Sequence, residues 1–192
     1  KPKRRLGLVG ERNMNNFYAD DLWQRQIRNK VLAPYYKNIS DEGRFIFLDK
    51  GKLATRLQRE FAIDTILQGK GNSVFGIEEK IVRWPGYSYK AYTLETMSCT
   101  VPGREKRGWM HYSTCDYLLY CFVQADSTSI IAHLIPFPKL QTWFFENDRY
   151  ETYKSSFTNQ INRTETKIVP IEDVWSAIPE CKELHISEAI YG

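Results

Sequence analysis

The residues from 62 to 84 constrain the fold of this chain more than any others, because they have the pattern of a β-hairpin. Two stretches with extended periodicity, residues 62–68 and 73–84, flank the turn cluster Gly69-Lys70-Gly71-Asn72. Glycine and asparagine readily accept the left-handed conformation that short hairpin loops need. The pattern therefore predicts two antiparallel strands joined by a tight loop.

Helices and further strands are expected on both sides of this hairpin. Residues 16–33 have the apolar period of a helix that Pro34 would end, and residues 50–62 place apolar side chains at a spacing of four. Further strands are expected at residues 90–98, 116–124, 129–136 and 167–169, and further helices at 138–150 and 170–178. This order predicts an α/β fold with a mixed central β-sheet flanked by helices.

Length and composition fit one domain over residues 1–192. The chain has 192 residues, of which 42% are hydrophobic, and this is enough to bury a sizeable core. No internal repeat and no Pro/Gly/Ser-rich linker divides it. Within the domain we expect N-terminal helices at 16–62, a core at about 50–150 and a C-terminal strand and helix at 166–192.

Charge and cysteine content narrow the class of protein. The net charge of +4 permits a polyanionic partner without requiring one. The four cysteines lack a CxxC spacing, which favours free thiols in a reducing cytoplasm. No apolar run approaches the roughly 18 residues that span a bilayer, and residues 1–5 have no apolar block behind them. We therefore expect a cytoplasmic protein without a membrane partner, and a homodimer is an open alternative.

The hairpin brings ionisable side chains together. A three-residue loop would place Asp64 opposite Glu78, roughly 5 Å away at Cβ. Glu78 and Lys80 point to the same face of their strand, about 7 Å apart, whereas Glu79 points away. A loop that is one residue shorter or longer would set Asp64 opposite a different residue. The register is therefore an expectation that depends on the loop length.

Two carboxylates and a lysine on one strand pair suit a particular chemistry. The carboxylates repel each other unless a cation lies between them. Their oxygen atoms select Mg²⁺ or Mn²⁺, which polarises a phosphate and lowers the pKa of a bound water. The lysine can orient that water and offset charge in the transition state. Asp64, Glu78 and Lys80 therefore predict metal-dependent hydrolysis of a phosphodiester bond.

The same residues resemble a known family. Asp64 followed by Glu78-Glu79-Lys80, on a hairpin that follows a helix, is similar to the PD-(D/E)XK superfamily of restriction-endonuclease-like nucleases. The resemblance covers roughly residues 50–136. It implies a restriction-endonuclease-like core, cleavage that depends on Mg²⁺ or Mn²⁺, and DNA as the usual substrate. It also implies that Asp64 and Glu78 bind the metal and that Lys80 is catalytic. Ile63 stands where the family often has proline.

Two further acids are candidates for this site. Glu95 lies midway along the strand expected at 90–98. If that strand packs beside the hairpin, Glu95 would add a third metal ligand and catalytic acid, and otherwise it is a surface charge. Glu60 precedes Asp64 by four residues, and its simpler interpretation is a charge on the surface of a helix.

A cationic loop follows the strand that carries Glu95. Its charges and its tryptophan could contact a phosphate backbone and stack on a base, and Lys90 would extend the same track. The simpler alternative is an exposed loop with the tryptophan docked in the core. The candidate nucleic-acid contacts are Arg83, Arg104, Lys106, Arg107 and Trp109.

Two classes of function remain in competition on these residues. The first is a Mg²⁺-dependent nuclease, with DNA as the expected partner. The second is a catalytically inactive module on the same fold that binds nucleic acid or protein. The intact set of Asp64, Glu78 and Lys80 favours the nuclease. His111 and His133 lack metal-ligand spacing, so we expect both to be structural or surface residues.

Overall fold

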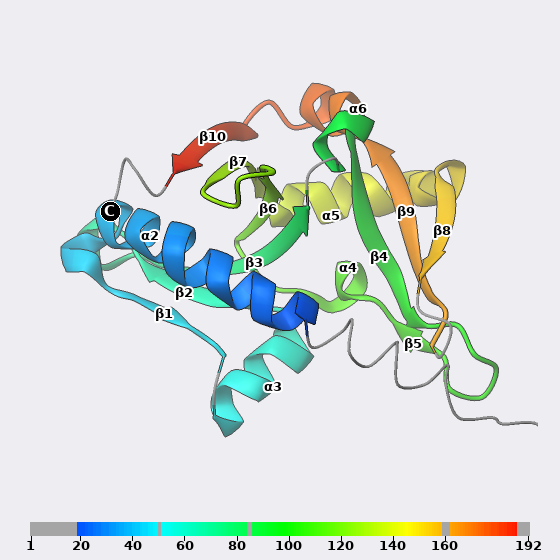
Figure 1. The fold of residues 1–192 in the computed structure, drawn as a ribbon. Coiled ribbons are helices and arrows are strands. Elements are labelled where there is room, and N and C mark those ends of the chain that lie inside the picture. Colours follow the sequence, from blue (N-terminus) through cyan, green and yellow to red (C-terminus); the bar gives the residue numbers. More distant parts are fainter. Residues whose placement is uncertain (1–18, 50, 84–85, 159–161, 188–192) are drawn as a thin grey trace, which may run out of the picture.

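The computed structural model describes residues 19–49, 51–83, 86–158 and 162–187. In these residues the strands form two sheets (Figure 1). The larger sheet has the order β1 (Phe45–Phe47), β2 (Thr65–Gln68), β3 (Val74–Arg83), β6 (Tyr117–Val123), β7 (Ser129–Pro136) and β10 (Lys182–Ser187). The smaller sheet has the order β5 (Lys106–Arg107), β4 (Ala91–Cys99), β9 (Thr164–Pro170) and β8 (Lys154–Thr158).

Helices cover both faces of the larger sheet. The α-helices are α2 (Ala33–Ile39), α3 (Lys52–Phe61), α4 (Trp109–Tyr112), α5 (Phe137–Phe145) and α6 (Ile171–Ala177). Residues 19–27 are also helical and continue into α2. Figure 1 shows this N-terminal helix crossing the larger sheet, with α5 between the two sheets.

The larger sheet is mixed, as the sequence predicts. β3 and β6 run parallel over seven residue pairs, from Ile77 opposite Tyr117 to Arg83 opposite Val123. Its other neighbouring strands are antiparallel. The expected strands at 116–124 and 129–136 are confirmed as β6 and β7. The coarse fold class, a mixed sheet flanked by helices, is therefore correct.

The strand expected at 90–98 forms, but it belongs to the other sheet. β4 pairs with β5 and β9, not with the β2–β3 hairpin. The chain leaves the larger sheet after β3, builds β4 and β5, and returns at β6 (Figure 1). The condition attached to Glu95, that this strand packs beside the hairpin, is therefore not met by strand pairing. Strand partners this distant in sequence are set by packing rather than by local periodicity.

The first helix does not end at Pro34. Residues 19–39 are continuously helical, and residues 16–18 lie outside the described part. A π-helical turn, Arg28–Leu32, precedes the proline, and the Ala33 N–H donates to the Arg28 carbonyl. A proline inside a helix clashes with the preceding turn and lacks an N–H. The wider π turn relieves both problems, so the helix continues to Ile39.

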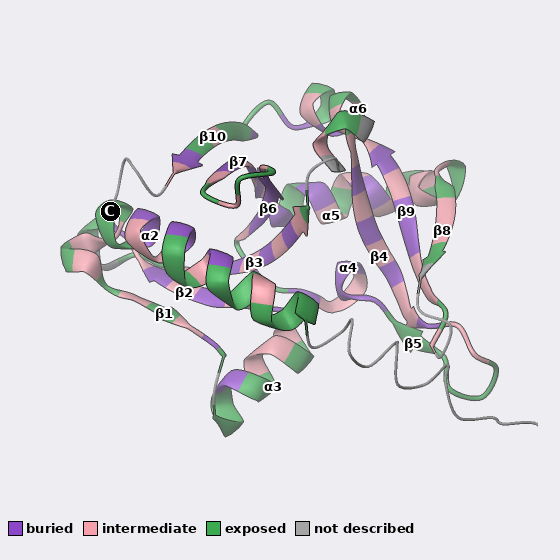
Figure 2. Cartoon of the chain, in the orientation of Figure 1, coloured by how far each residue is buried: buried purple, intermediate pink, exposed green. Residues whose placement is uncertain are grey.

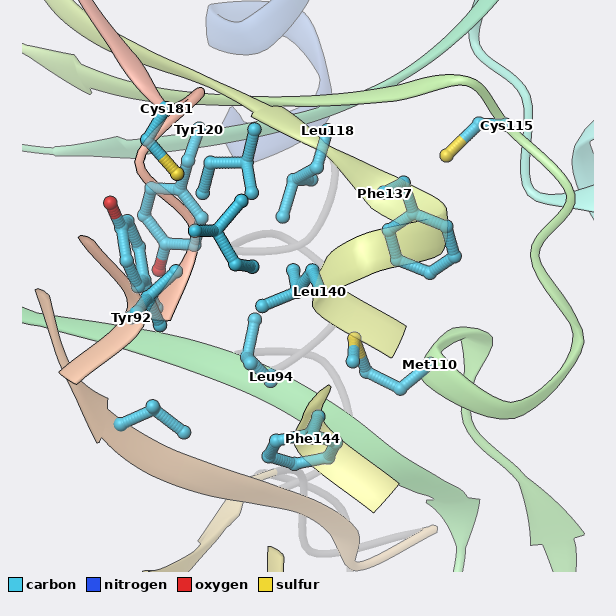
Figure 3. Packing of buried hydrophobic residues seen from close by; sticks show 14 of the residues in the cluster. Tyr92, Leu94, Met110, Cys115, Leu118, Tyr120, Phe137, Leu140, Phe144 and Cys181 are labelled. Atoms are coloured by element: carbon cyan, nitrogen blue, oxygen red, sulfur yellow. The ribbon is translucent and has the colours of Figure 1, made fainter. Parts of the chain in front are cut away.

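Two hydrophobic clusters lie on opposite faces of the larger sheet. One joins the N-terminal helix to β2, β3, β6 and β7, and it includes Val31, Tyr36 and Ile81. The other joins β6 to β4, β9, α4, α5 and α6. Figure 2 shows the buried positions on β4, β6, β9 and α5, and Figure 3 shows Leu94, Leu118 and Leu140 meeting in the second cluster. The two faces of β3 therefore lie toward different hydrophobic clusters.

No helix in the described ranges is both long enough and apolar enough to cross a membrane.

Candidate functional site

The hairpin has the register that a three-residue loop predicts. Thr65 pairs with Ile77 and Gln68 with Val74, and the Gly69 N–H donates to the Ser73 carbonyl at 2.8 Å. Gly71 takes the left-handed conformation, with φ of +70°. Asp64 comes immediately before β2, and its N–H donates to the Ile77 carbonyl at 2.9 Å. The local prediction is thus confirmed over β2, and Asp64 lies at its entry.

Glu78 and Lys80 share one face of β3. Their partners on parallel β6 are Leu118 and Tyr120, which both belong to the cluster between the two sheets. Within the described ranges, the Glu78 carboxylate makes no hydrogen bond and no ion pair, and the Lys80 ammonium makes none either. Both side chains are therefore available to something outside the described protein atoms.

The pKa of Glu78 is raised well above its usual value. Burial is the largest cause, and the charge of Asp64 adds to it, whereas the charge of Lys80 acts in the opposite direction. A buried carboxylate without a partner is costly, because it has lost water and gained nothing in return. Glu78 thus binds a proton more readily than an exposed glutamate does, unless a cation binds the carboxylate instead of the proton.

The opposite face of β3 holds a fully paired carboxylate. Glu79 accepts hydrogen bonds from Arg28 Nε at 2.7 Å, Tyr36 Oη at 2.9 Å and Thr65 Oγ1 at 2.6 Å. Its side chain has no exposed surface. The expectation that Glu79 points away from Glu78 is confirmed. What the sequence did not indicate is that Glu79 is the centre of a buried polar network.

Asp64 connects the two faces. Its Oδ1 accepts from Gln58 Nε2 at 3.1 Å and lies 3.1 Å from Arg28 Nη2. Its Oδ2 accepts the Glu79 N–H at 3.0 Å. A carboxylate can accept about four hydrogen bonds, so Oδ2 retains a lone pair. Asp64 is therefore held in place by Arg28 and by the backbone of β3, with one position left on Oδ2.

Glu95 lies on β4, in the second sheet. Thr93, two residues earlier on the same face of β4, binds the Tyr120 hydroxyl through both its N–H, at 3.1 Å, and its Oγ1, at 2.9 Å. The Glu95 carboxylate accepts the Ser98 hydroxyl at 2.6 Å. After burial, the charges of Glu95 and then Glu78 raise the pKa of the Tyr112 hydroxyl. Tyr112 thus lies within the electrostatic reach of both acids.

Gly108 allows this part of the chain to approach β4 closely. A Cβ at Gly108 would lie 2.4 Å from the Glu95 carbonyl oxygen, and the Gly108 N–H donates to the Thr96 carbonyl at 2.7 Å. Any larger residue would push α4 away from β4. Because Tyr112 ends α4, Gly108 sets the position of Tyr112 relative to Glu95.

The cationic loop lies at the exposed edge of the second sheet. Lys106 and Arg107 form β5 and, like Arg104, are exposed. Trp109, in contrast, is only 6% exposed and packs against Phe137 in the core. The expectation that Trp109 stacks on a base is therefore wrong, because apolar burial holds the ring in the core. The alternative weighed from the sequence, a docked tryptophan, is what the structure has.

Arg83 is engaged by the N-terminal helix. Its Nη2 lies 3.0 Å from Asp20 Oδ1, and its guanidinium sits 3.9 Å from the centroid of the Trp23 ring. Its side chain is still about half exposed, so it keeps donors for another contact. Arg83 lies at the end of β3 that is farther from the hairpin loop.

The remaining candidates have structural partners. Glu60 pairs with Arg56 on the exposed side of α3, as the helix-surface interpretation has it. His133 is buried between Tyr92 and Glu183, and His111 packs on Phe145. All four cysteines are free and buried. Among the described residues, no group of three or more His, Cys, Asp or Glu side chains is close enough to hold a metal ion as the side chains stand.

Sequence reasoning missed Arg28 and Tyr112. Arg28 follows Ile27 on the helix and precedes Val31 by three, so it lies at the border of the apolar face. A cation at such a border commonly keeps its head group in water, so nothing in the sequence distinguished Arg28. Nothing distinguished Tyr112 either, because its proximity to the acids depends on the approach of α4 to β4.

No family model, no curated protein and no solved structure matches the chain.

Proposed function

We propose that this chain is a metal-dependent nuclease that hydrolyses phosphodiester bonds, with DNA as the substrate. The observation that carries the proposal is the pair Glu78 and Lys80. They point to one face of β3, and neither has an ion-pair partner within the described ranges. A solvated strand pair would be expected to pair its charges or expose them fully. An acid and a lysine that share a face but have no ion-pair partner indicate a site that binds charged groups.

Asp64 and Glu78 supply oxygen donors of the kind that a divalent cation binds. Glu78 has a half-buried carboxylate that lacks a partner in the described part, and Asp64 keeps a lone pair on Oδ2. Oxygen donors of this kind select Mg²⁺ or Mn²⁺. We propose that Asp64 and Glu78 hold the ion and that Glu95 supports it from β4. When bound, such an ion polarises the phosphate and lowers the pKa of the attacking water.

The side chains of the protein do the positioning. Arg28 and Gln58 fix the Asp64 carboxylate, so Asp64 loses little rotamer freedom when it binds a ligand. Lys80, on the same face as Glu78, orients the attacking water and offsets negative charge on the phosphate as it builds. The exposed cations Arg104, Lys106 and Arg107 provide contacts to the phosphate backbone.

The test is cleavage of defined substrates. Purified protein is incubated with supercoiled plasmid or with single-stranded oligonucleotides, in Mg²⁺, Mn²⁺ or EDTA. We expect cleavage with either ion and none in EDTA, and we expect Glu78→Gln to abolish it. Glu60→Gln is the matched control, because it removes a carboxylate from the exposed side of α3. Equal cleavage by wild type and Glu78→Gln would overturn the assignment of the site.

A second function, a binding module without catalysis, is favoured by one contact. Arg28 already neutralises Asp64 at 3.1 Å, an arrangement that is stable without any metal. The same experiment separates the two functions. A protein that retards the oligonucleotides in a gel but cleaves none of them with either ion would be such a module.

A further inference from the structure

One cavity of the described structure lies away from the candidate metal site. Its volume is about 630 Å³, within the range of pockets that hold small organic groups. It is formed where the start of β4, the end of β9, α6 and β10 meet. Its aromatic lining comes from Tyr87, His133 and Trp175, with Lys90, Glu172 and Glu183 as its charged residues.

The aromatic lining is fixed by hydrogen bonds. Trp175 Nε1 donates to Tyr92 Oη at 2.8 Å, and a hydrogen bond of 2.7 Å joins Tyr92 Oη to His133 Nδ1. A second hydrogen bond, of 3.3 Å, joins His133 Nε2 to the Glu183 carboxylate. The rings of Tyr87 and Trp175 each meet the His133 ring at 71°. Rings held in this way lose little entropy when a flat ligand packs on them.

A second cavity continues toward the hairpin. It has a volume of about 520 Å³ and shares Ala91 and Ile168 with the first. Val82 and Tyr120 line it as well. Val82 lies two residues beyond Lys80 on the same face of β3, about 7 Å along the strand. The two cavities therefore adjoin at Ala91 and Ile168, and we refer to them together as the trough. Through Val82 the second cavity reaches β3, the strand that carries Lys80 and Glu78.

Cations lie along this trough. Lys90 lines the first cavity and Lys154 the second, and both are exposed. Neither forms an ion pair within the described ranges. Aromatic rings beside cations without an ion pair suit a chain of bases and phosphates. Of the two acids that line the first cavity, Glu183 already contacts His133, His185 and Tyr87, and Glu172 is exposed to solvent.

We infer that this trough binds single-stranded nucleic acid, with one unpaired base seated against Tyr87 and Trp175 and the phosphates following Lys90 and Lys154 toward Lys80. A base in a duplex has both faces stacked on its neighbours, so only an unpaired base can pack on these rings. The inference rests on the proposed function, because it takes the hairpin as the place where the strand is cut. It makes a strand with an unpaired segment, not a continuous duplex, the substrate.

The test measures binding in EDTA, so that no strand is cut. The anisotropy of a labelled 12-nucleotide single strand is titrated with wild type, Tyr87→Ala, Tyr87→Phe and Lys90→Ala/Lys154→Ala. Loss of one stacked base should weaken binding roughly tenfold in Tyr87→Ala, and Tyr87→Phe, which keeps the ring, should recover most of it. The double lysine variant should lower the slope of log K against log salt by about 0.7 for each lysine.

Lys139→Ala is the matched control, since this exposed lysine of α5 pairs with Glu180 and lines neither cavity. Tight binding of a blunt duplex, unchanged binding by Tyr87→Ala, or full displacement of the strand by a mononucleotide would each overturn the inference. The last outcome would make the cavity a nucleotide pocket. Binding as expected without any cleavage in Mg²⁺ would instead overturn only the nuclease proposal, so the two failures are distinguishable.

Discussion

Glu78 and Glu79 are neighbours in sequence, yet their carboxylates differ in the partners that the fold gives them. Burial raises the pKa of both carboxyls. Glu79 receives a guanidinium and two hydroxyl groups. Glu78, on the other face of β3, receives none of these from the described residues. One strand therefore carries a carboxylate that belongs to the core and a carboxylate that is left unsatisfied.

The difference shows how to separate a structural acid from a functional one. Folding stability favours partners for every buried charge, and Arg28 provides one for Glu79. An acid that stays without a partner destabilises the fold, and such destabilisation is typical of functional sites. The contrast across β3 can be tested on each side separately.

The largest effect is expected from Arg28→Met. The change leaves the Glu79 carboxylate buried without its cation, which should lower the free energy of unfolding by about 3–5 kcal/mol at neutral pH. Urea denaturation measures it. The double variant Arg28→Met/Glu79→Leu should regain most of the loss. A single variant as stable as wild type would mean that the network on this face contributes nothing.

The pH dependence of Arg28→Met follows from the raised pKa of Glu79. Without Arg28, the Glu79 pKa in the folded state should rise further above its unfolded value. Stability is then fully present below the unfolded pKa, near 4.5, and is lost as the pH rises through the folded pKa. The deficit against wild type should therefore shrink as the pH falls toward 4.5.

On the other face of β3, Lys80→Ala should change activity rather than stability. If the proposed function holds, the single-turnover cleavage rate at saturating Mg²⁺ should drop by roughly 10²–10³. The free energy of unfolding should change by at most about 1 kcal/mol, because Lys80 makes no ion pair with the described residues. Lys80→Arg should restore little, since a planar guanidinium replaces a compact ammonium. Equal rates in all three proteins would make this face an ordinary solvated surface.

Glu78→Gln should stabilise the metal-free protein. The amide removes a half-buried charge that lacks a partner in the described part, so the free energy of unfolding should rise by about 0.5–2 kcal/mol in EDTA. Wild type should lose stability as the pH rises above about 4.5 and through the raised pKa of Glu78, and the variant should lose less. Thermal unfolding between pH 4 and 8 follows both proteins. A variant less stable than wild type at every pH would show that Glu78 has a structural partner.

The smallest effect is expected from neutralising Arg104, Lys106 and Arg107 together. Binding of nucleic acid should weaken, and the slope of log K against log salt should flatten by about one unit for each phosphate that the protein no longer neutralises. Stability should hardly change, because these side chains are exposed. Unchanged affinity with an unchanged slope would remove this loop from the path of the substrate.

The parts of the fold that the sequence predicted are local. The register of the hairpin follows from Gly71 and the loop length, and β6 and β7 follow from two apolar runs around a polar turn. The face shared by Glu78 and Lys80 follows from strand alternation alone. The sequence also correctly predicted that Glu79 points to the opposite face of β3. Each of these features depends on residues within one short segment.

The parts that could not be predicted depend on distant contacts. The membership of β4 in a second sheet depends on β9, which the sequence indicated only as a short strand at 167–169. Arg28 finds Glu79 and Asp64 only after the N-terminal helix packs on the sheet. The short edge strands β1, β5 and β8 have too few apolar positions to show a period. Trp109 was ambiguous, because a loop tryptophan can dock or stay exposed.

The pairing of β4 has a consequence for the order in which the candidate site assembles. β2 and β3 are joined by a short loop, so the segment with Asp64, Glu78 and Lys80 can close as soon as it has been synthesised. Glu95 instead lies on β4, whose longest pairing is with β9. In that pairing Glu95 is opposite Thr166. Closing so long a loop carries an entropic cost that local pairing avoids. We therefore expect the hairpin to be able to pair before residues 164–170 are synthesised, whereas the strand that holds Glu95 gains its β9 partner only afterwards.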